Sequence, residues 1–263
     1  MNISKATAQG GRFSQEDRFV VSNIKDGKLI AVMDGHGGAE VSSRLAKMLP
    51  LIWRKHIVFP ASIFTAIQNT FKDLADLTSR MEAGSTMSLV FIPKPADVVY
   101  VAILGDSPVV VKDAEGRVEV SPMHNARSNA AELAAAQARG AFYYNGYIQA
   151  HFSGPGIQMT RVMGDSELGR IVSREPEVYT KQINADSFVL VGTDGLFDPS
   201  HRNPQPEIDA VTALIEAGAD ARGLVNRALA IPTGDNVTAI LVRCGNKKSR
   251  RKKMGNHDDI PAA

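Results

Sequence analysis

Four aspartates stand at the ends of strongly apolar runs. They are Asp34 after residues 29–33, Asp106 after 98–104, Asp194 after 188–191 and Asp235 before 237–242. Two further acidic residues, Glu16 and Asp17, precede the apolar run 19–24. Strands that share a buried face end together at the rim of their sheet, so we expect these carboxylates to converge at one edge. Converging carboxylates repel each other unless cations neutralise them, and the pattern therefore predicts bound metal.

The residue types select the metal. Carboxylates, backbone carbonyls and water suit Mg²⁺ or Mn²⁺. The chain has six histidines and one cysteine, with no HxxxH or CxxC spacing, so a zinc site is not expected. Any single Asp-Gly pair is more often a simple turn former. Several acidic strand ends in one chain weaken that simpler interpretation.

Two basic groups accompany the acidic ones. His36 lies in the glycine-rich loop DGHGG at 34–38, where the backbone can approach a ligand closely, and it could donate a proton beside a metal-binding carboxylate. Arg12, four residues before Glu16, carries a guanidinium fork that could bind a phosphate group through two hydrogen bonds. Taken alone, a loop histidine and an exposed arginine would indicate nothing more than surface residues.

The elements that must position these groups are mostly strands joined by hairpins. Asp26-Gly27 between the runs 19–24 and 29–33 is a strong hairpin signal. Further strands are expected at 86–92, 98–104, 108–111, 117–120, 157–162, 188–191 and 237–242. The stretch 140–156, rich in tyrosine and glycine, predicts an irregular excursion near the site.

Helices are expected in sequential pairs. Apolar spacing predicts helices over about 41–52, where Pro50 should break or kink the helix, and over 63–81, with Ser62 as cap and Gly84 ending it. An alanine-rich helix is expected over 128–139, and two more around 208–215 and 224–229. Strands that outnumber helices and connect as hairpins favour an α+β fold of packed antiparallel sheets covered by helix pairs.

Composition places the chain among ordinary globular proteins. It has 263 residues, 44% hydrophobic and 22% charged, and no apolar run long enough to span a bilayer. Residues 1–13 lack the apolar core of a secretory signal, and Cys244 stands alone, so a cytoplasmic protein without disulfides is expected.

Charge is concentrated at the end of the chain. Six of the 30 basic residues lie in 247–253 (KKSRRKK), and residues 1–246 carry 24 basic and 26 acidic groups. We expect one domain over 1–246 and a basic, disordered tail over 247–263. A nearly neutral body gives no support for nucleic-acid binding.

Seven motifs follow one another in a recognisable order. They are RFSQED at 12–17, VMDGHGG at 32–38, GST at 84–86, LGDS at 104–107, RVMGD at 161–165, TDGLFD at 193–198 and GDNVT at 234–238. This series closely resembles the metal-dependent protein serine/threonine phosphatases of type 2C, the PPM family, over about residues 4–243. The resemblance implies an α-β-β-α sandwich, with two face-to-face antiparallel sheets and helices outside each sheet.

The resemblance also implies a site with two Mg²⁺ or Mn²⁺ ions, and a weaker third. By position, Asp34 would bridge two ions, with Glu16 and the Gly35 carbonyl on one of them and Asp17 orienting bound water. Asp194 and Asp235 would hold the other ion, and Asp106 with Asp194 matches the third position. Arg12 would bind phosphate and His36 would protonate the leaving alkoxide. Asp165 is expected to be structural.

The implied reaction is hydrolysis of phosphoserine and phosphothreonine in proteins by a water that bridges two ions, without a covalent enzyme intermediate. The implied partners are phosphoproteins modified by an opposing serine/threonine kinase, and the protein is expected to be a monomer. One departure from the family pattern is Met123-His124, where many members carry Asp-His.

Two other classes of function remain open. One is a catalytically silent binding module on the same fold, which would be expected to have lost carboxylates at the metal positions; none is lost. The other is a small-molecule phosphatase, on this fold or of the haloacid dehalogenase type. The latter needs a nucleophilic DxDx[TV] motif, which Met33-Asp34-Gly35-His36 does not provide.

Overall fold

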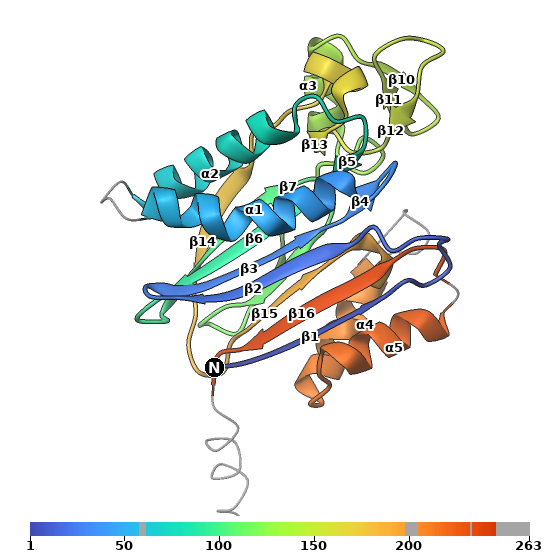
Figure 1. Cartoon of the computed structure of the whole chain (residues 1–263). Helices are drawn as coiled ribbons and strands as arrows, with labels where there is room; N and C mark the ends of the chain where they lie inside the picture. Colours follow the sequence, from blue (N-terminus) through green and yellow to red (C-terminus); the bar gives the residue numbers. More distant parts are fainter. Residues whose placement is uncertain (58–61, 198–204, 232, 246–263) are drawn as a thin grey trace, which may run out of the picture.

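The structure is a computed structural model that describes residues 1–57, 62–197, 205–231 and 233–245 (Figure 1). The expected tail over 247–263 and the end of the TDGLFD motif, Asp198, lie outside the described residues. Among the helices described, none is long and apolar enough to cross a membrane.

The first sheet has five antiparallel strands. Their spatial order is β14 (Glu177–Gln182), β7 (Val98–Leu104), β6 (Met87–Pro93), β3 (Gly27–Met33) and β2 (Arg18–Ile24). The hairpin predicted at Asp26-Gly27 is confirmed, because β2 and β3 pair antiparallel with Ile24 opposite Gly27. The edge strand β14 was not predicted, since its exposed and half-buried residues lack a clear apolar run.

The second sheet also has five antiparallel strands. Their order is β1 (Asn2–Ala8), β16 (Val237–Arg243), β15 (Phe188–Gly192), β8 (Val109–Lys112) and β9 (Val118–Val120). The edge strand β1 escaped sequence analysis because it is polar, with the sequence NISKATA and only partly buried residues. An edge strand needs little apolar surface, because one partner strand supplies its hydrogen bonds.

The two sheets pack face to face through branched aliphatic side chains. Alternate residues of the central strands point into this layer, among them Ile30, Val32, Val101, Val191 and Ile240, all fully buried. A separate cluster joins the outer face of the first sheet to α1 and α2, and another joins the second sheet to α4 and α5. The resulting α-β-β-α sandwich confirms the predicted fold class (Figure 1).

The helices that cover the sheets are α1 (Glu40–Ile57), α2 (Ile63–Thr78), α4 (Gln205–Glu216) and α5 (Ala221–Ala230). The predicted break at Pro50 is wrong, because α1 continues through it. The helix buries Leu49, Ile52 and Trp53 in the core, and this packing offsets the hydrogen bond that proline cannot make.

The second helix of the first pair begins as predicted. Ser62 caps α2 by accepting a hydrogen bond from the Thr65 backbone N–H at 3.3 Å. The helix ends at Thr78, however, and Gly84 belongs instead to the short strand β5 (Gly84–Ser85).

A smaller unit stands beside one end of the sandwich (Figure 1). It comprises α3 (Ala130–Ala138) and a small sheet of β10 (Phe142–Tyr144), β11 (Tyr147–Gln149) and β12 (Gly156–Ile157). Residues 140–156, predicted to be irregular, therefore contain a hairpin. The strand predicted over 157–162 is wrong beyond Ile157, because the backbone there bonds to loops: Thr160 to His124 and Val162 to Ser173.

A fourth sheet, also three-stranded, lies under this unit (Figure 1). Its order is β13 (Met163–Gly164), β5 and β4 (Gly35–His36), with β5 in the centre. Two 3₁₀ helices, η1 (Ser166–Ile171) and η2 (Asp194–Leu196), follow β13 and β15 respectively. These short elements connect the strand ends of the sandwich to the loops that carry the polar motifs.

Candidate active site

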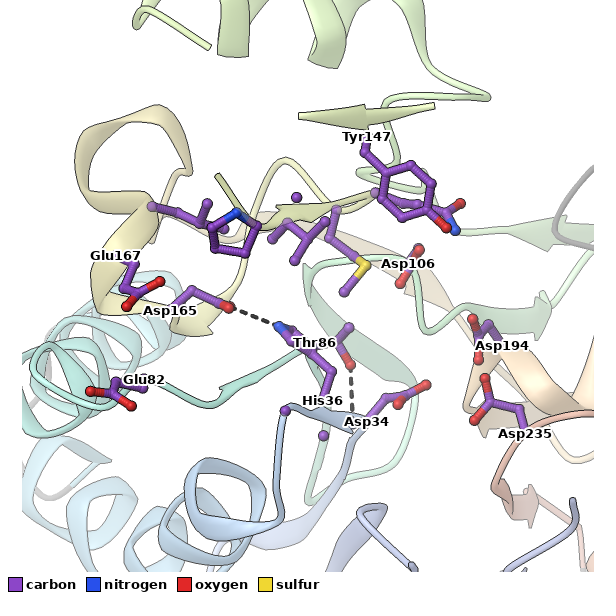
Figure 2. Close-up of a pocket in the computed structure, with 18 of the residues that line it drawn as sticks. Asp34, His36, Glu82, Thr86, Asp106, Tyr147, Asp165, Glu167, Asp194 and Asp235 are labelled. Carbon is purple, nitrogen blue, oxygen red and sulfur yellow. Dashed lines mark hydrogen bonds and ion pairs between the residues drawn. The ribbon is translucent and has the colours of Figure 1, made fainter. Parts of the chain in front are cut away.

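The strand ends of both sheets meet around one pocket of about 490 Å³ (Figure 2). Seven of the candidate site residues from the sequence line it: Arg12, Asp34, Gly35, His36, Asp106, Asp194 and Asp235. Asp165, Tyr147 and Met159 also line it. Figure 2 shows Asp34, Asp106, Asp194 and Asp235 facing a common space. The expected convergence of these four aspartates is therefore observed.

Antiparallel pairing explains why groups so distant in sequence come together. Asp34 follows the end of β3 and Asp106 follows the end of β7, both in the first sheet. Asp194 follows the end of β15, and Asp235 precedes the start of its antiparallel neighbour β16, both in the second sheet. The pocket thus lies where these strand ends of the first sheet meet those of the second sheet.

Crowding of carboxyl groups raises their pKa values. Burial, followed by the nearby charge of Asp194, raises the pKa of Asp34 well above its ordinary value. Burial raises the pKa of Asp17 to about 7, although hydrogen bonds from Thr238 and Thr193 oppose the shift. Burial and Asp194 also raise the pKa of Asp235, against the opposing charge of Arg12. This arrangement favours a compensating cation.

Asp17 sits behind the pocket rather than on its wall. Its Oδ2 accepts hydrogen bonds from the hydroxyls of Thr238 at 2.6 Å and Thr193 at 3.0 Å. Its Oδ1 is buried and has no hydrogen-bond partner among the described residues. A buried carboxylate oxygen without a partner is costly, so this atom is suited to a ligand that the protein itself does not supply.

Glu16 is placed differently from the sequence expectation of a converging carboxylate. Its Oε2 accepts from the Gly38 backbone N–H at 3.2 Å and its Oε1 from the Ser14 hydroxyl at 2.7 Å. It does not line the pocket. Its backbone is nonetheless close to the site, because a Cβ at Gly35 would lie only 2.7 Å from the Glu16 carbonyl oxygen.

Arg12 is held at the mouth of the pocket by the loop before β16. Its Nη2 donates to Asp235 Oδ2 at 2.7 Å, and its Nε donates to the Gly234 carbonyl at 3.0 Å. The side chain is 49% exposed, so this ion pair can exchange for another anionic partner.

His36 is bonded to a residue that the sequence assigned only a structural part. Its Nε2 lies 2.8 Å from Asp165 Oδ2, and the two side chains meet inside the pocket (Figure 2). The histidine therefore stands within the cluster rather than on an independent surface loop.

Several residues that position the cluster were missed by sequence reasoning. The Asn125 amide donates to Asp106 Oδ2 at 2.7 Å. Thr86 accepts from the Asp34 backbone N–H at 3.1 Å, and its own N–H donates to the Asp34 carbonyl. The Asn236 side chain accepts from the Glu16 N–H and donates to the carbonyls of Gln9 and Ser14. Thr86 lies in the GST motif and Asn236 in the GDNVT motif, and these motifs were the signal in the sequence that could have identified them.

The donors fit divalent cations that prefer oxygen ligands. Across the part of the chain that the structure describes, no three His, Cys, Asp or Glu side chains already stand close enough together to hold a metal. The raised pKa values and the unpartnered Asp17 Oδ1 nevertheless suit Mg²⁺ or Mn²⁺, and the pocket wall is rich in carboxylates.

Comparison with known proteins gives related sequences and related folds. Probable protein phosphatase 2C 7 from Oryza sativa is 29% identical to this chain, over 92% of this chain and 66% of its own length. A sex-determining protein of C. elegans superposes with a TM-score of 0.81 at 24% identity, over 96% of this chain and 67% of that one. A serine-threonine phosphatase 2C from Toxoplasma gondii superposes with a TM-score of 0.70 at 20% identity, over 91% and 93%.

The chain spans about half to two thirds of the length of the first curated relatives that it matches. One rice relative carries the word mitochondrial in its name. The family model described as protein phosphatase 2C matches residues 2–237, which is nearly the whole described body. With the sandwich and the clustered strand-end aspartates, this match shows that the chain belongs to the protein phosphatase 2C family.

Proposed function

We propose that this chain hydrolyses phosphoserine and phosphothreonine in proteins, with Mn²⁺ or Mg²⁺ as cofactor. The observation that carries the proposal is the meeting of Asp34, Asp106, Asp194 and Asp235 with His36 in one pocket. Membership of the protein phosphatase 2C family supports the same chemistry. A carboxylate-rich pocket without a cation would repel a phosphate group, so the substrate class and the cofactor are proposed together.

The residues that would hold metal are those of the strand ends. Asp34 would be shared by two ions, Glu16 and the Gly35 carbonyl would serve one of them, and Asp17 would orient water. Asp194 and Asp235 would serve the other ion, and Asp106 with Asp194 a weaker third. When bound, such ions supply Lewis-acid activation of water and neutralise phosphoryl charge.

The remaining groups act on the substrate. Arg12 would exchange its ion pair with Asp235 for the phosphoryl oxygens, which its planar guanidinium can bind through two hydrogen bonds. The protonated imidazole of His36 would give a proton to the serine or threonine oxygen as the phosphorus–oxygen bond breaks, and would be left neutral. An alkoxide is a poor leaving group, so this proton transfer lowers the barrier.

The setting of the enzyme is part of the proposal. We place it in the cytoplasm as a monomer acting against a serine/threonine kinase, with residues 1–246 as the phosphatase domain. The single cysteine and the nearly neutral charge of residues 1–246 support that setting.

The alternative, a silent regulatory module on the same fold, has less support. A module without catalysis has no need to keep carboxylates in a pocket where their pKa values are raised at the expense of stability.

Release of inorganic phosphate from a phosphothreonine peptide with Mn²⁺ tests the proposal. Asp34→Asn and Asp194→Asn should each lose nearly all turnover and keep the thermal unfolding midpoint of the parent or exceed it, because each removes a crowded charge. The matched control is Asp97→Asn, an exposed aspartate in the turn between β6 and β7, at the opposite end of the first sheet. Near-normal rates in both pocket variants would place the reaction elsewhere, and an inactive parent would favour the silent module.

A further inference from the structure

The three-stranded sheet β13-β5-β4 sets three residues side by side. His36 on β4 lies opposite Gly84 on β5, and Gly84 lies opposite Gly164 on β13. Asp165 directly follows Gly164. A histidine and an aspartate 129 positions apart therefore face each other across a glycine, and their side chains meet at 2.8 Å above it (Figure 2).

Gly84 has no side chain because the two polar groups occupy that space. A Cβ at Gly84 would lie 1.9 Å from Asp165 Oδ2 and 2.2 Å from His36 Nε2. Real Cβ atoms do not approach that closely, so any other residue at this position would push the pair apart. The contact between His36 and Asp165 thus explains why the GST motif begins with glycine.

The backbone holds Asp165 in an unusual conformation. Its φ of 49° and ψ of 54° are left-handed, which few residues other than glycine and asparagine adopt without cost. The Arg174 guanidinium donates to the carbonyls of Val162 and Gly164 on the same turn. Asp165 precedes η1 but makes no side-chain hydrogen bond to cap it. Its carboxylate is used instead for His36.

We propose that Asp165 is the positioning residue for His36, holding the imidazole in one orientation and one tautomer for proton transfer. The inference rests on the proposed function, because it assigns a purpose to the acid of that reaction. A carboxylate on Nε2 requires a proton on that nitrogen. The proton given to the leaving oxygen therefore comes from Nδ1 of the protonated ring, which has no hydrogen-bond partner among the described residues. Its loss leaves the neutral ring as the Nε2–H tautomer.

The burial of the pair supports a positioning role for Asp165 and a proton-transfer role for His36. The Asp165 side chain is 9% exposed and that of His36 is 23% exposed, so solvent screens their contact only partly. Both line the pocket, together with Glu82 and Glu167 (Figure 2). Among the described residues, Asp165 is the one hydrogen-bond partner of the His36 ring.

Two substitutions remove the contact to different extents while respecting the backbone. Asp165→Gly keeps the left-handed conformation and deletes the carboxylate. Asp165→Asn keeps the shape, tolerates the same backbone and retains an oxygen that can accept from Nε2. We expect Asp165→Gly to slow phosphothreonine peptide turnover by on the order of 10–100-fold, a part of what general acid catalysis supplies. Asp165→Asn should be rescued to an intermediate rate.

The leaving group separates positioning from a general structural effect. Turnover of p-nitrophenyl phosphate should fall much less in Asp165→Gly, because p-nitrophenolate leaves without a proton. In the background of His36→Gln, the Asp165→Gly change should cost little more on the peptide, since it acts through the missing ring. The control Asp97→Asn should match the parent on both substrates. Equal losses on both substrates, or losses that add to those of His36→Gln, would overturn the proposal.

A spectroscopic readout keeps this inference distinct from the proposed function. With ¹⁵N-labelled histidine in the full chain, at a pH where the imidazole is neutral, His36 should show the Nε2–H tautomer. The Asp165→Gly variant should shift towards a mixture of tautomers, and Asp165→Asn should keep Nε2–H. An unchanged tautomer in Asp165→Gly would refute the positioning role, whatever the activity. If the parent is inactive but Asp165→Gly still changes the His36 tautomer as expected, the result would refute the proposed function and leave the positioning role standing.

Discussion

Threonine hydroxyls and one buried histidine fix the loops around the crowded aspartates. Thr193 and Thr238 donate to Asp17, and the Thr193 hydroxyl also accepts from the Thr238 backbone N–H at 3.0 Å. His124 is fully buried, and its Nδ1 accepts from the Gly105 N–H at 3.2 Å, next to Asp106. These residues orient the carboxylates and hold the loops, so substitutions in them should change the stability of the fold more than the reaction rate.

His124 gives a pH-dependent contribution to stability. Burial and, next, the charge of Arg161 lower the pKa of His124 below its ordinary value of 6.5, against the opposing carboxylates of Glu132 and Glu177. Below pH 6.5 the unfolded chain takes up a proton that the folded chain resists. The stability contribution is therefore complete above the unfolded pKa and is lost as the pH falls through the window down to the folded pKa.

The His124→Asn variant tests this contribution. Its Oδ1 can still accept from the Gly105 N–H, but the side chain no longer titrates. Urea unfolding between about pH 7.5 and about pH 5 should show a smaller loss of unfolding free energy in the variant than in the parent. Parallel pH profiles for the two proteins would show that His124 does not carry the effect.

At the residue scale, the sequence located the aspartates but not their partners. Asp34, Asp106, Asp194 and Asp235 follow from apolar runs, because strand ends fix their places. The pairing of Arg12 with Asp235, the hydrogen bond of Glu16 with Gly38 and the contact of Asp165 with His36 depend on loop conformations. No periodicity in the sequence encodes those conformations.

Among the elements, the hairpin β10–β11 brings one aromatic side chain, Tyr147, to the edge of the pocket. Tyr147 lines the pocket (Figure 2). The Arg127 guanidinium carbon lies 5.2 Å from the centroid of the Tyr147 ring. Phe142 lies on the same hairpin, half exposed, and does not line the pocket. An aromatic ring at the edge of this pocket can contact a peptide chain that enters it.

Replacing Tyr147 should therefore affect large substrates more than small ones. Tyr147→Ala is expected to raise the KM for a phosphothreonine peptide several-fold and to leave kcat on p-nitrophenyl phosphate nearly unchanged. Phe142→Ala is the matched control and should behave like the parent with both. Steady-state kinetics would contradict the expectation if the two variants gave the same peptide KM.

Prediction of elements succeeded where burial gives a clear period and failed where it does not. The strand 98–104 was predicted with its observed bounds because six of its seven residues are strongly apolar. The polar edge strand β1 gave no such signal. The segment 157–162 is apolar enough for a strand. In the structure, however, the Arg161 guanidinium pairs with Glu132 on α3, and the backbone of the segment bonds to neighbouring loops.

For the whole molecule, the four-layer order follows from which faces are apolar. Strands buried on both faces, such as β3 and β15, must lie between two other layers, and sequential helix pairs supply the outer ones. Hairpins join β2 to β3, β6 to β7 and β8 to β9, and they make these neighbours antiparallel. This reasoning could predict the sandwich, whereas the order of strands within each sheet needed the structure.

The domain boundary that we propose at residue 246 leads to a prediction for the whole chain. Deleting residues 247–263 removes the basic segment KKSRRKK but none of the strands described, since β16 ends at Arg243. Phosphothreonine peptide hydrolysis should be unchanged in the shortened protein. A large loss of activity, with the thermal unfolding midpoint lowered, would mean that these residues belong to the folded domain.

Metal dependence of phosphate release is the most direct test of the account. The purified full chain, freed of metal with EDTA and then dialysed, should release no phosphate from a phosphothreonine peptide. Adding Mn²⁺ or Mg²⁺ should restore hydrolysis, because the crowded carboxylates of Asp34, Asp194 and Asp235 then face a cation. Addition of the same buffer without Mn²⁺ or Mg²⁺ serves as the control. Hydrolysis that continues at the same rate in excess chelator would contradict the central claim that this pocket works through bound metal.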